Sequence, residues 1–307
     1  MKYTKEYRTK TVVKVGNVKI GDGFTVIAGP CAIESEEQIT KVAEFLAEVG
    51  VKVLRGGAFK PRTSPYSFQG HGEKALRWLR KAADEYGLVT VTEVMDTKQV
   101  PLVAKYSDIV QVGARNAQNF ELLKAVGRVD NPVLLKRGMG NTVQELLYSA
   151  EYVMSEGNEN VILCERGIRT FENSTRFTLD ISAVPVVKEL SHLPIIVDPS
   201  HPAGRRSLVT PLAKAAYAVG ADGVMVEVHP RPEEAVSDSS QQLTFEDFRD
   251  LLTELRSLGW NSPGNVLAES SLNPSIKEAI PEAIKPSRTD WETEMLLLEL
   301  GGLGWRR

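Results

Sequence analysis

The chain has 307 residues and a formal net charge of −3, from 37 lysines and arginines against 40 aspartates and glutamates. Hydrophobic residues make up 42% of the sequence and charged residues 25%, a composition that excludes disordered, collagenous and membrane-spanning chains. The slight acidic excess argues against a nucleic-acid-binding protein that works through a basic face.

Two features of the sequence bear on location. Only two cysteines occur, Cys31 and Cys164, which is too few for a secreted disulfide framework. The N-terminus lacks the apolar segment of a signal peptide, and no apolar run approaches the roughly 18 residues of a membrane span. We therefore expect a cytoplasmic protein with no membrane partner.

The first predicted element is a short β-hairpin. Residues 11–15 and 18–20 are rich in valine and flank Gly16-Asn17, a pair that is typical of a tight turn. We expect this extension, residues 1–23, to plug one mouth of the domain that follows.

From residue 24 onward, short apolar runs alternate eight times with longer segments of helical period. The runs lie at residues 24–28, 51–54, 89–94, 109–112, 132–136, 161–164, 194–197 and 223–228. Apolar runs separated by helices indicate parallel strands buried on both faces. Eight such units match a closed barrel of roughly 250 residues. We therefore predict an α/β fold, a single (β/α)8 TIM barrel over residues 24–260; an open doubly wound sheet is the alternative.

The C-terminal segment differs in character from the barrel. It begins with the breaker sequence Asn261-Ser262-Pro263-Gly264 and carries four prolines, with two weak apolar patches. We expect residues 261–307 to form a tail of unknown role, whose order the sequence leaves open.

The ends of the predicted strands carry the chemistry, because in a (β/α)8 barrel they face one common pocket. Six cations follow the second, fourth, fifth and sixth strands: Arg55, Lys60, Arg62, Arg115, Lys136 and Arg166. So many positive charges repel one another unless a polyanion is bound, and guanidinium groups suit phosphate and carboxylate oxygens. We expect a ligand with more than one anionic group, although any single cation could instead form a salt bridge at the rim.

A second set of residues combines a thiol, an imidazole and two carboxylates: Cys31, His201, Glu227 and Asp238. They follow the first, seventh and eighth strands, and the first and eighth are neighbours in a closed barrel. Such mixed soft and hard donors suit Mn, Fe, Co or Zn rather than Mg or Ca. We predict one divalent transition metal and no organic cofactor, although each residue alone would more often be structural. Cys164 is not grouped with other candidate metal ligands and is predicted to lie in the core.

Five motifs occur in a fixed order: Gly29-Pro30-Cys31, Leu54-Arg55-Gly56-Gly57-Ala58-Phe59-Lys60-Pro61-Arg62-Thr63-Ser64, Gly113-Ala114-Arg115, Leu135-Lys136-Arg137-Gly138 and Asp198-Pro199-Ser200-His201-Pro202. Together they resemble the type I beta class of 3-deoxy-D-arabino-heptulosonate 7-phosphate (DAHP) synthase. The resemblance implies condensation of phosphoenolpyruvate with erythrose 4-phosphate and water, the first step of the shikimate pathway. It also implies a homo-oligomer, a tetramer in this family.

The resemblance assigns a role to each candidate residue. It gives Cys31, His201, Glu227 and Asp238 to the metal, and Arg55, Lys60, Arg115, Lys136 and Arg166 to phosphoenolpyruvate. It gives Arg62, Thr63 and Ser64 to the aldose phosphate. Glu93, with Lys136, would hold the attacking water, so that Lys136, Glu93, Cys31 and His201 are the expected catalytic residues.

Three other interpretations remain open. A lysine at a strand end, such as Lys136, also fits a Schiff-base aldolase. The related 3-deoxy-D-manno-octulosonate 8-phosphate synthase uses arabinose 5-phosphate, but an Ala-Asn-Arg pattern is expected there in place of Lys60-Pro61-Arg62. A noncatalytic barrel that only binds a partner is disfavoured by the complete set of cations and metal ligands.

Overall fold

Eight parallel strands close into a barrel, which the computed structural model describes within residues 1–261. In chain order the strands are β3 (Thr25–Gly29), β4 (Val53–Arg55), β5 (Val89–Val94), β6 (Ile109–Val112), β7 (Val133–Lys136), β8 (Val161–Glu165), β9 (Ile195–Val197) and β10 (Gly223–Glu227). Each pairs in parallel with the next, and β10 closes the ring by pairing with β3. The predicted TIM barrel is confirmed, and the open sheet is excluded.

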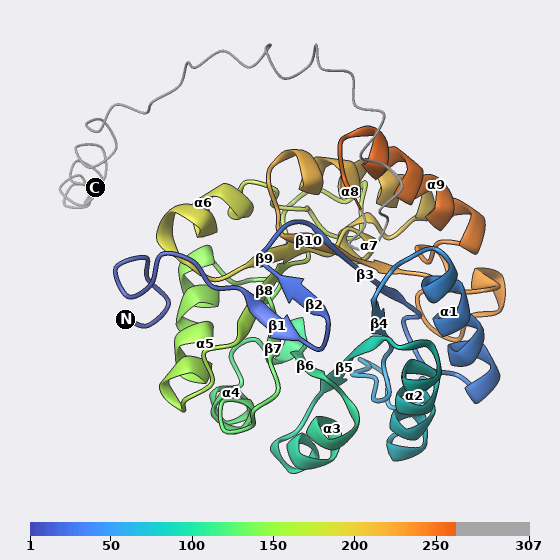
Figure 1. Ribbon diagram of the computed structural model, residues 1–307, viewed down its shortest axis with the longest axis horizontal. Helices are drawn as coiled ribbons and strands as arrows, with labels where there is room; N and C mark the ends of the chain where they lie inside the picture. The colour runs from blue at the N-terminus through green and yellow to red at the C-terminus, as the bar shows by residue number, and fades with distance from the viewer. Residues whose placement is uncertain (262–307) are drawn as a thin grey trace, which may run out of the picture. The chain divides into compact units, whose positions relative to one another are not determined.

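Helices surround the barrel on the outside (Figure 1). They are α1 (Glu36–Glu48), α2 (Glu73–Tyr86), α3 (Val100–Tyr106), α4 (Phe120–Val126), α5 (Val143–Ser155), α6 (Ala183–Leu190), α7 (Ser200–Ala203), α8 (Val209–Ala218) and α9 (Phe245–Ser257), with 3-10 turns η1 (Thr97–Gln99), η2 (Ala114–Asn116), η3 (Arg206–Leu208) and η4 (Pro232–Glu234). Their N-termini follow local sequence signals. Ser35 caps α1, and Thr142 and Thr244 form capping boxes with Glu145 and Asp247 at α5 and α9. Among residues 1–261, no helix is both long and apolar enough to cross a bilayer.

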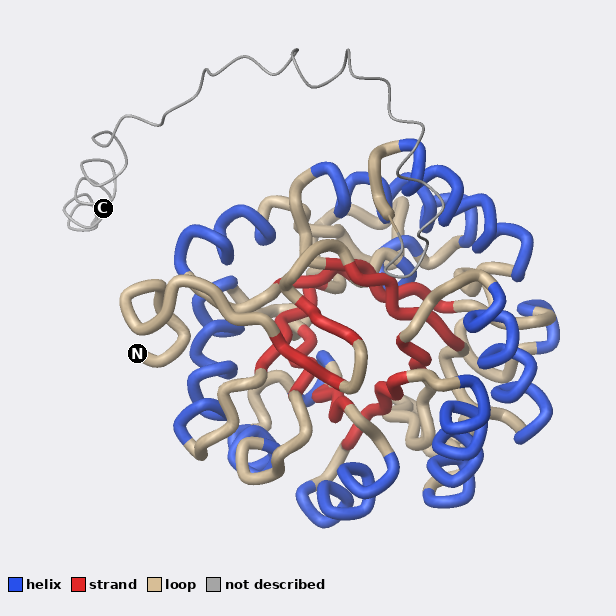
Figure 2. The backbone as a smooth tube through the Cα atoms, in the orientation of Figure 1, coloured by secondary structure: helices blue, strands red, loops and turns tan. Residues whose placement is uncertain are grey.

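The N-terminal hairpin is present as predicted. Strands β1 (Val13–Val15) and β2 (Val18–Ile20) pair antiparallel and lie across one end of the barrel (Figure 2). Val13 and Ile20 are fully buried, and together with Val15 and Val18 they form one apolar cluster with the inward-facing side chains of the barrel strands. The hairpin therefore plugs the N-terminal mouth, and this leaves the opposite end as the open one.

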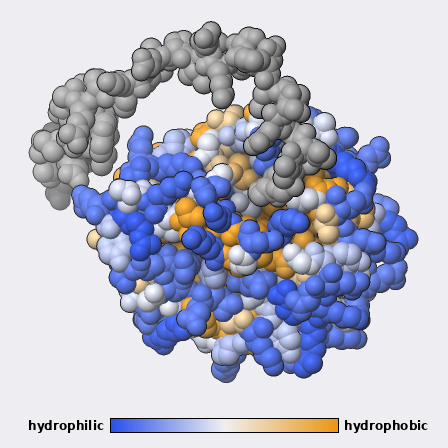
Figure 3. All heavy atoms as spheres, viewed as in Figure 1, coloured by the Kyte–Doolittle hydropathy of each residue, from blue (hydrophilic) through white to orange (hydrophobic). Residues whose placement is uncertain are grey.

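Two apolar layers make up the core. The larger lies between the helices and the outer face of the barrel, and the smaller fills the barrel interior. Cys164 belongs to the inner layer and is fully buried, which confirms its predicted place in the core. On the face that carries the hairpin, hydrophobic residues are exposed near the centre, and most of the residues around them are hydrophilic (Figure 3). The predicted tail lies outside the described residues apart from Asn261.

Candidate active site

A cavity of about 370 Å³ lies at the C-terminal ends of the barrel strands. Eleven of the predicted site residues line it: Arg55, Lys60, Arg62, Thr63, Ser64, Glu93, Arg115, Lys136, Arg166, His201 and Asp238. The other two, Cys31 and Glu227, are fully buried and do not line the cavity. Cys31 contacts Lys60 and Glu227 contacts His201, and both of these partners do line it. The barrel thus brings together residues that are as much as 207 positions apart in the chain, as for Cys31 and Asp238.

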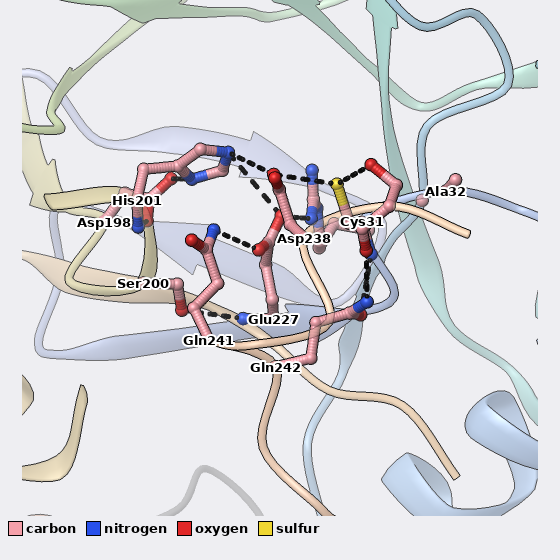
Figure 4. Close-up of polar contacts among 12 residues, drawn as sticks. Cys31, Ala32, Asp198, Ser200, His201, Glu227, Asp238, Gln241 and Gln242 are labelled. Atoms are coloured by element: carbon pink, nitrogen blue, oxygen red, sulfur yellow. Dashed lines mark hydrogen bonds and ion pairs between the residues drawn. The ribbon is translucent and has the colours of Figure 1, made fainter. Parts of the chain in front are cut away.

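The four predicted metal ligands converge on one side of this cavity (Figure 4). Ligand atoms of Cys31, Glu227 and Asp238 all lie within 4.8 Å of one another, so these three side chains can hold a metal ion. His201 faces the two carboxylates, with its Nε2 atom 3.5 Å from Glu227 Oε1 and 3.9 Å from Asp238 Oδ2. One nitrogen, one sulfur and two carboxylate donors fit a divalent transition metal.

The sulfur of Cys31 has polar neighbours on several sides. Its Sγ atom lies 3.0 Å from Lys60 Nζ, 3.1 Å from Ser237 Oγ and 3.3 Å from Asp238 Oδ2. Burial, and next the charge of Glu227, raises the pKa of the Cys31 thiol to about 12. The thiol can therefore donate its proton to Asp238, and a metal bound at this sulfur would replace that proton.

Asp238 adopts an unusual backbone conformation. Its φ is +52°, the left-handed region, where no other described non-glycine residue lies. Aspartate tolerates this conformation better than most residues, and such positions are common at functional sites. Although burial opposes it, the charges of His201 and Arg176 lower the pKa of Asp238 to about 2. The side chain is therefore an ionised carboxylate at neutral pH.

Glu227 is already paired within the protein. Its Oε1 accepts a hydrogen bond from Arg55 at 2.8 Å, and its Oε2 accepts one from Gln241 at 2.7 Å. The Arg55–Glu227 ion pair is almost fully buried, so Arg55 neutralises a candidate metal ligand as well as lining the cavity. Sequence reasoning grouped Arg55 with the free cations and overlooked Gln241, because neither pairing is visible before the loops are placed.

Asp198 is a site residue to which sequence reasoning gave no role. This buried aspartate follows β9, and its Oδ2 accepts hydrogen bonds from Lys136 Nζ and from His201 Nδ1. Although burial opposes it, the charges of His201 and Lys136 hold the pKa of Asp198 well below its usual range. Its position directly after a predicted strand and three residues before His201 could have identified it as a site residue.

Four arginines in the cavity form no ion pair with any residue in the range 1–261. They are Arg62, Arg115, Arg166 and Arg169. Arg166 is buried, with its guanidinium 4.3 Å from the centre of the Phe177 ring, and burial lowers its pKa. A buried arginine without an acidic partner is costly unless an anion binds to it. Arg169, which sequence reasoning missed, adds a further positive charge from the loop between β8 and α6.

The loop between β4 and α2 forms another part of the rim. Thr63 and Ser64 are exposed, whereas Arg62 is partly buried and its guanidinium donates to Ser237 Oγ at 2.7 Å. Because Ser237 also contacts Cys31, this loop is connected to the candidate metal ligands.

Comparisons with known proteins agree with this geometry. The family model described as the DAHP synthetase I family matches residues 6–261. The phospho-2-dehydro-3-deoxyheptonate aldolase of Thermotoga maritima is 61% identical over 249 residues, which cover 81% of this chain and 74% of that protein. The 2-dehydro-3-deoxyphosphooctonate aldolase of Geobacter sulfurreducens is 31% identical over 266 residues, covering 80% and 97%.

Solved structures show the same likeness. The crystal structure of DAHP synthase from Thermotoga maritima superposes with a TM-score of 0.82 at 59% identity, covering 83% of this chain and 76% of that one. A truncated form of the Thermotoga maritima enzyme gives a TM-score of 0.78 at 56% identity, covering 83% and 95%.

Proposed function

The chain belongs to the DAHP synthetase I family, and from this premise we propose that it condenses phosphoenolpyruvate with erythrose 4-phosphate and water. The products are DAHP and inorganic phosphate, and the reaction opens the shikimate pathway. One observation carries the assignment beyond the family: unpaired arginines line the same cavity as His201 and Asp238, the two members of the Cys/His/Glu/Asp cluster that reach it. That combination suits a reaction between an anionic enol and an aldehyde.

Phosphoenolpyruvate brings roughly three negative charges, about two of them on its phosphate at neutral pH. Arg166 and Arg115 have no acidic partner among residues 1–261, and Lys136 is connected to His201 through Asp198, which contacts both. We assign these three cations to phosphoenolpyruvate, with Lys60 and Arg55 completing the neighbouring wall. Their role is to hold the enol carbon in place while they neutralise its charge.

A divalent metal would be held by Cys31, His201, Glu227 and Asp238, and when bound it would act as a Lewis acid toward the aldehyde oxygen. The protein itself sets the protonation state and the orientation of these donor side chains. The Asp198 carboxylate accepts a hydrogen bond from the Nδ1–H of His201, which leaves the Nε2 lone pair facing Glu227 and Asp238.

The reaction balances without any further reactant. C3 of phosphoenolpyruvate forms a bond to the aldehyde carbon, water adds to C2, and the aldehyde oxygen becomes a hydroxyl with the proton that the water gives up. The resulting hemiketal phosphate then loses inorganic phosphate by breaking the bond between C2 and the bridging oxygen, and the proton of the C2 hydroxyl leaves with the phosphate. In our proposal, Glu93 receives the proton of the attacking water, and Lys136 donates hydrogen bonds to the anionic groups.

The aldose phosphate is assigned to Arg62, Thr63 and Ser64, on the loop between β4 and α2. This loop reads Lys60-Pro61-Arg62, in place of the Ala-Asn-Arg pattern expected for an enzyme that takes arabinose 5-phosphate. We therefore propose erythrose 4-phosphate as the preferred aldehyde.

The direct test measures phosphate release by the purified protein with Mn²⁺, phosphoenolpyruvate and either erythrose 4-phosphate or arabinose 5-phosphate. We expect rapid release with erythrose 4-phosphate and little with arabinose 5-phosphate. The opposite preference would reassign the substrate, and no release with either would overturn the proposal. Borohydride treatment during turnover supplies a second check, because a covalent adduct at Lys136 would indicate a Schiff-base mechanism instead.

The assembly state is also a proposal. The resemblance to this family supports a homotetramer, and sedimentation equilibrium of the purified protein tests it.

A further inference from the structure

The carboxylate of Glu93 is held at one oxygen only. Glu93 lies near the end of β5 and lines the cavity. Its Oε2 accepts a hydrogen bond from Gln111 Nε2 at 3.2 Å. Its Oε1 is buried, yet within residues 1–261 it has no hydrogen-bond partner. A buried carboxylate oxygen without a donor is costly, so the donors of residues 1–261 satisfy the Glu93 carboxylate only in part.

Gln111 reaches Glu93 because the barrel register sets the two residues side by side. β5 and β6 pair in parallel, and Glu93 lies opposite Gln111 in that ladder. Residues in register on neighbouring strands point to the same side of the sheet, which here is the cavity. Gln111 is 3% exposed and lies between two fully buried valines, Val110 and Val112. A buried amide in such a strand has to make its hydrogen bonds to the side chains beside it.

Gly113 leaves the space that the second oxygen of this carboxylate occupies. Its φ of −72° is available to every residue, so backbone conformation does not require glycine at this position. A Cβ atom built there would lie 2.0 Å from Glu93 Oε1, far inside van der Waals contact. Glycine at position 113 is therefore needed for Glu93 to keep its observed position. Gln111 holds one oxygen of the carboxylate while Gly113 makes room for the other.

We propose that Gln111 is a positioning residue, which holds Glu93 by Oε2 so that the carboxylate can accept a proton from the water that adds to C2. The inference rests on the proposed function and deepens it. In this step the water oxygen forms the bond to C2, one O–H bond of the water breaks, and the proton goes to the Glu93 carboxylate. Gln111 has no contact with the reacting atoms in this scheme and acts only through Glu93.

The test is a double-mutant cycle on kcat with Gln111→Leu and Glu93→Gln. Leucine keeps most of the volume of the glutamine and removes its N–H donor. We expect Gln111→Leu alone to lower kcat by about 10-fold to 100-fold, a part of what a general base contributes, with both KM values changed less than about threefold. In the Glu93→Gln background the same substitution should change kcat by less than about twofold, because the group it positions has been removed.

The matched control is Gln118→Leu. Gln118 is an exposed glutamine whose amide donates to Glu145 Oε1 at 3.4 Å, so the control also removes a hydrogen bond between a glutamine and a glutamate. It should leave kcat unchanged. Gly113→Ala is a second, independent test, because the added methyl group would push against Glu93 Oε1. This substitution should displace the Glu93 side chain and lower kcat. In the Glu93→Gln background it should have little effect on kcat.

Each outcome decides the question. Additive losses in the cycle, or raised KM values with an unchanged kcat, would show that Gln111 acts independently of Glu93 and overturn the proposal. If Gln111→Leu does not fold, as judged by its circular dichroism, the Gly113→Ala cycle decides in its place. If the unmodified protein releases no phosphate from either substrate pair, the proposed function itself fails, which is a different result from an active protein with an additive cycle.

Discussion

The Nδ1 atom of His201 lies 2.6 Å from Oδ2 of Asp198, and the backbone N–H of His201 donates to Oδ1 of the same carboxylate at 3.1 Å. Oδ2 also accepts a hydrogen bond from Lys136. One buried carboxylate therefore connects a proposed metal ligand to a proposed phosphate-binding cation. Both groups are oriented by the same atom, so a change there should affect both halves of the site.

Asp198→Asn should lower kcat/KM by about 100-fold and weaken metal binding by about 10-fold to 100-fold. Asparagine keeps the shape of aspartate but removes its charge, and its amide nitrogen would oppose the donors of His201 and Lys136. Steady-state kinetics and competitive titration with Co²⁺ measure the two effects. The control is Asp222→Asn, because Asp222 accepts hydrogen bonds from Lys188 and the Ile195 amide outside the cavity. Unchanged metal affinity in Asp198→Asn would refute the link to His201.

Metal affinity should rise with pH between about pH 6.5 and 9, by up to about tenfold per unit. Burial raises the pKa of the Cys31 thiol to about 12, so the metal-free protein carries this proton over the whole range and must release it on binding. Burial lowers the pKa of His201 from its ordinary value, so this side chain contributes less to the slope than the thiol does. Competitive Co²⁺ titration at several pH values measures the dependence.

The control variants separate the thiol from the rest of the protein. Cys31→Ser should bind Co²⁺ more weakly and with a flatter pH dependence, since a serine hydroxyl ionises far less readily than a thiol. Cys164→Ala removes the core cysteine and should keep the full slope. A pH-independent affinity in the unmodified protein would mean that the sulfur does not bind the metal.

The barrel could be predicted from the sequence because its signal is local. Each strand is a short apolar run, and the predicted bounds differ from those observed by only a few residues; for example, the run at 51–54 corresponds to β4 at Val53–Arg55. The convergence of Cys31 with Asp238 followed from topology alone, because closure places the first and last barrel strands side by side. These inferences need only the order of elements.

The rest of the site depends on which side chains meet across the barrel. Arg55 and Glu227 form a buried ion pair although 172 residues separate them, and no spacing rule relates the two. Gln111 is an ordinary polar residue in an apolar run, and its role appears only once the register with Glu93 is known. Charge and residue type therefore predict the chemistry of the site, while the pairing of its members is set by the three-dimensional fold.

Arg62→Ala should raise the KM for erythrose 4-phosphate by at least about tenfold and that for phosphoenolpyruvate by less than about threefold. A charge-assisted hydrogen bond to phosphate contributes about 1.5–3 kcal/mol, which corresponds to a change of this size. Initial rates with each substrate varied in turn separate the two constants. Arg8→Ala, which removes an exposed arginine paired with Glu159, is the control. Equal increases in both KM values would contradict the division of the cations between the substrates.

Ile20→Ala should destabilise the protein by about 2–5 kcal/mol while leaving kcat within about twofold of the unmodified value. Ile20 is fully buried and belongs to the apolar cluster that joins the hairpin to the barrel interior, so its truncation leaves a cavity in the plug. The catalytic cavity lies at the opposite end of the strands and should keep its geometry. Urea unfolding measures the loss, and Lys14→Ala, an exposed position on the same hairpin, should be nearly neutral. A loss below about 0.5 kcal/mol for Ile20→Ala would mean that the hairpin contributes little to closing the barrel, since surface substitutions cause changes of that size.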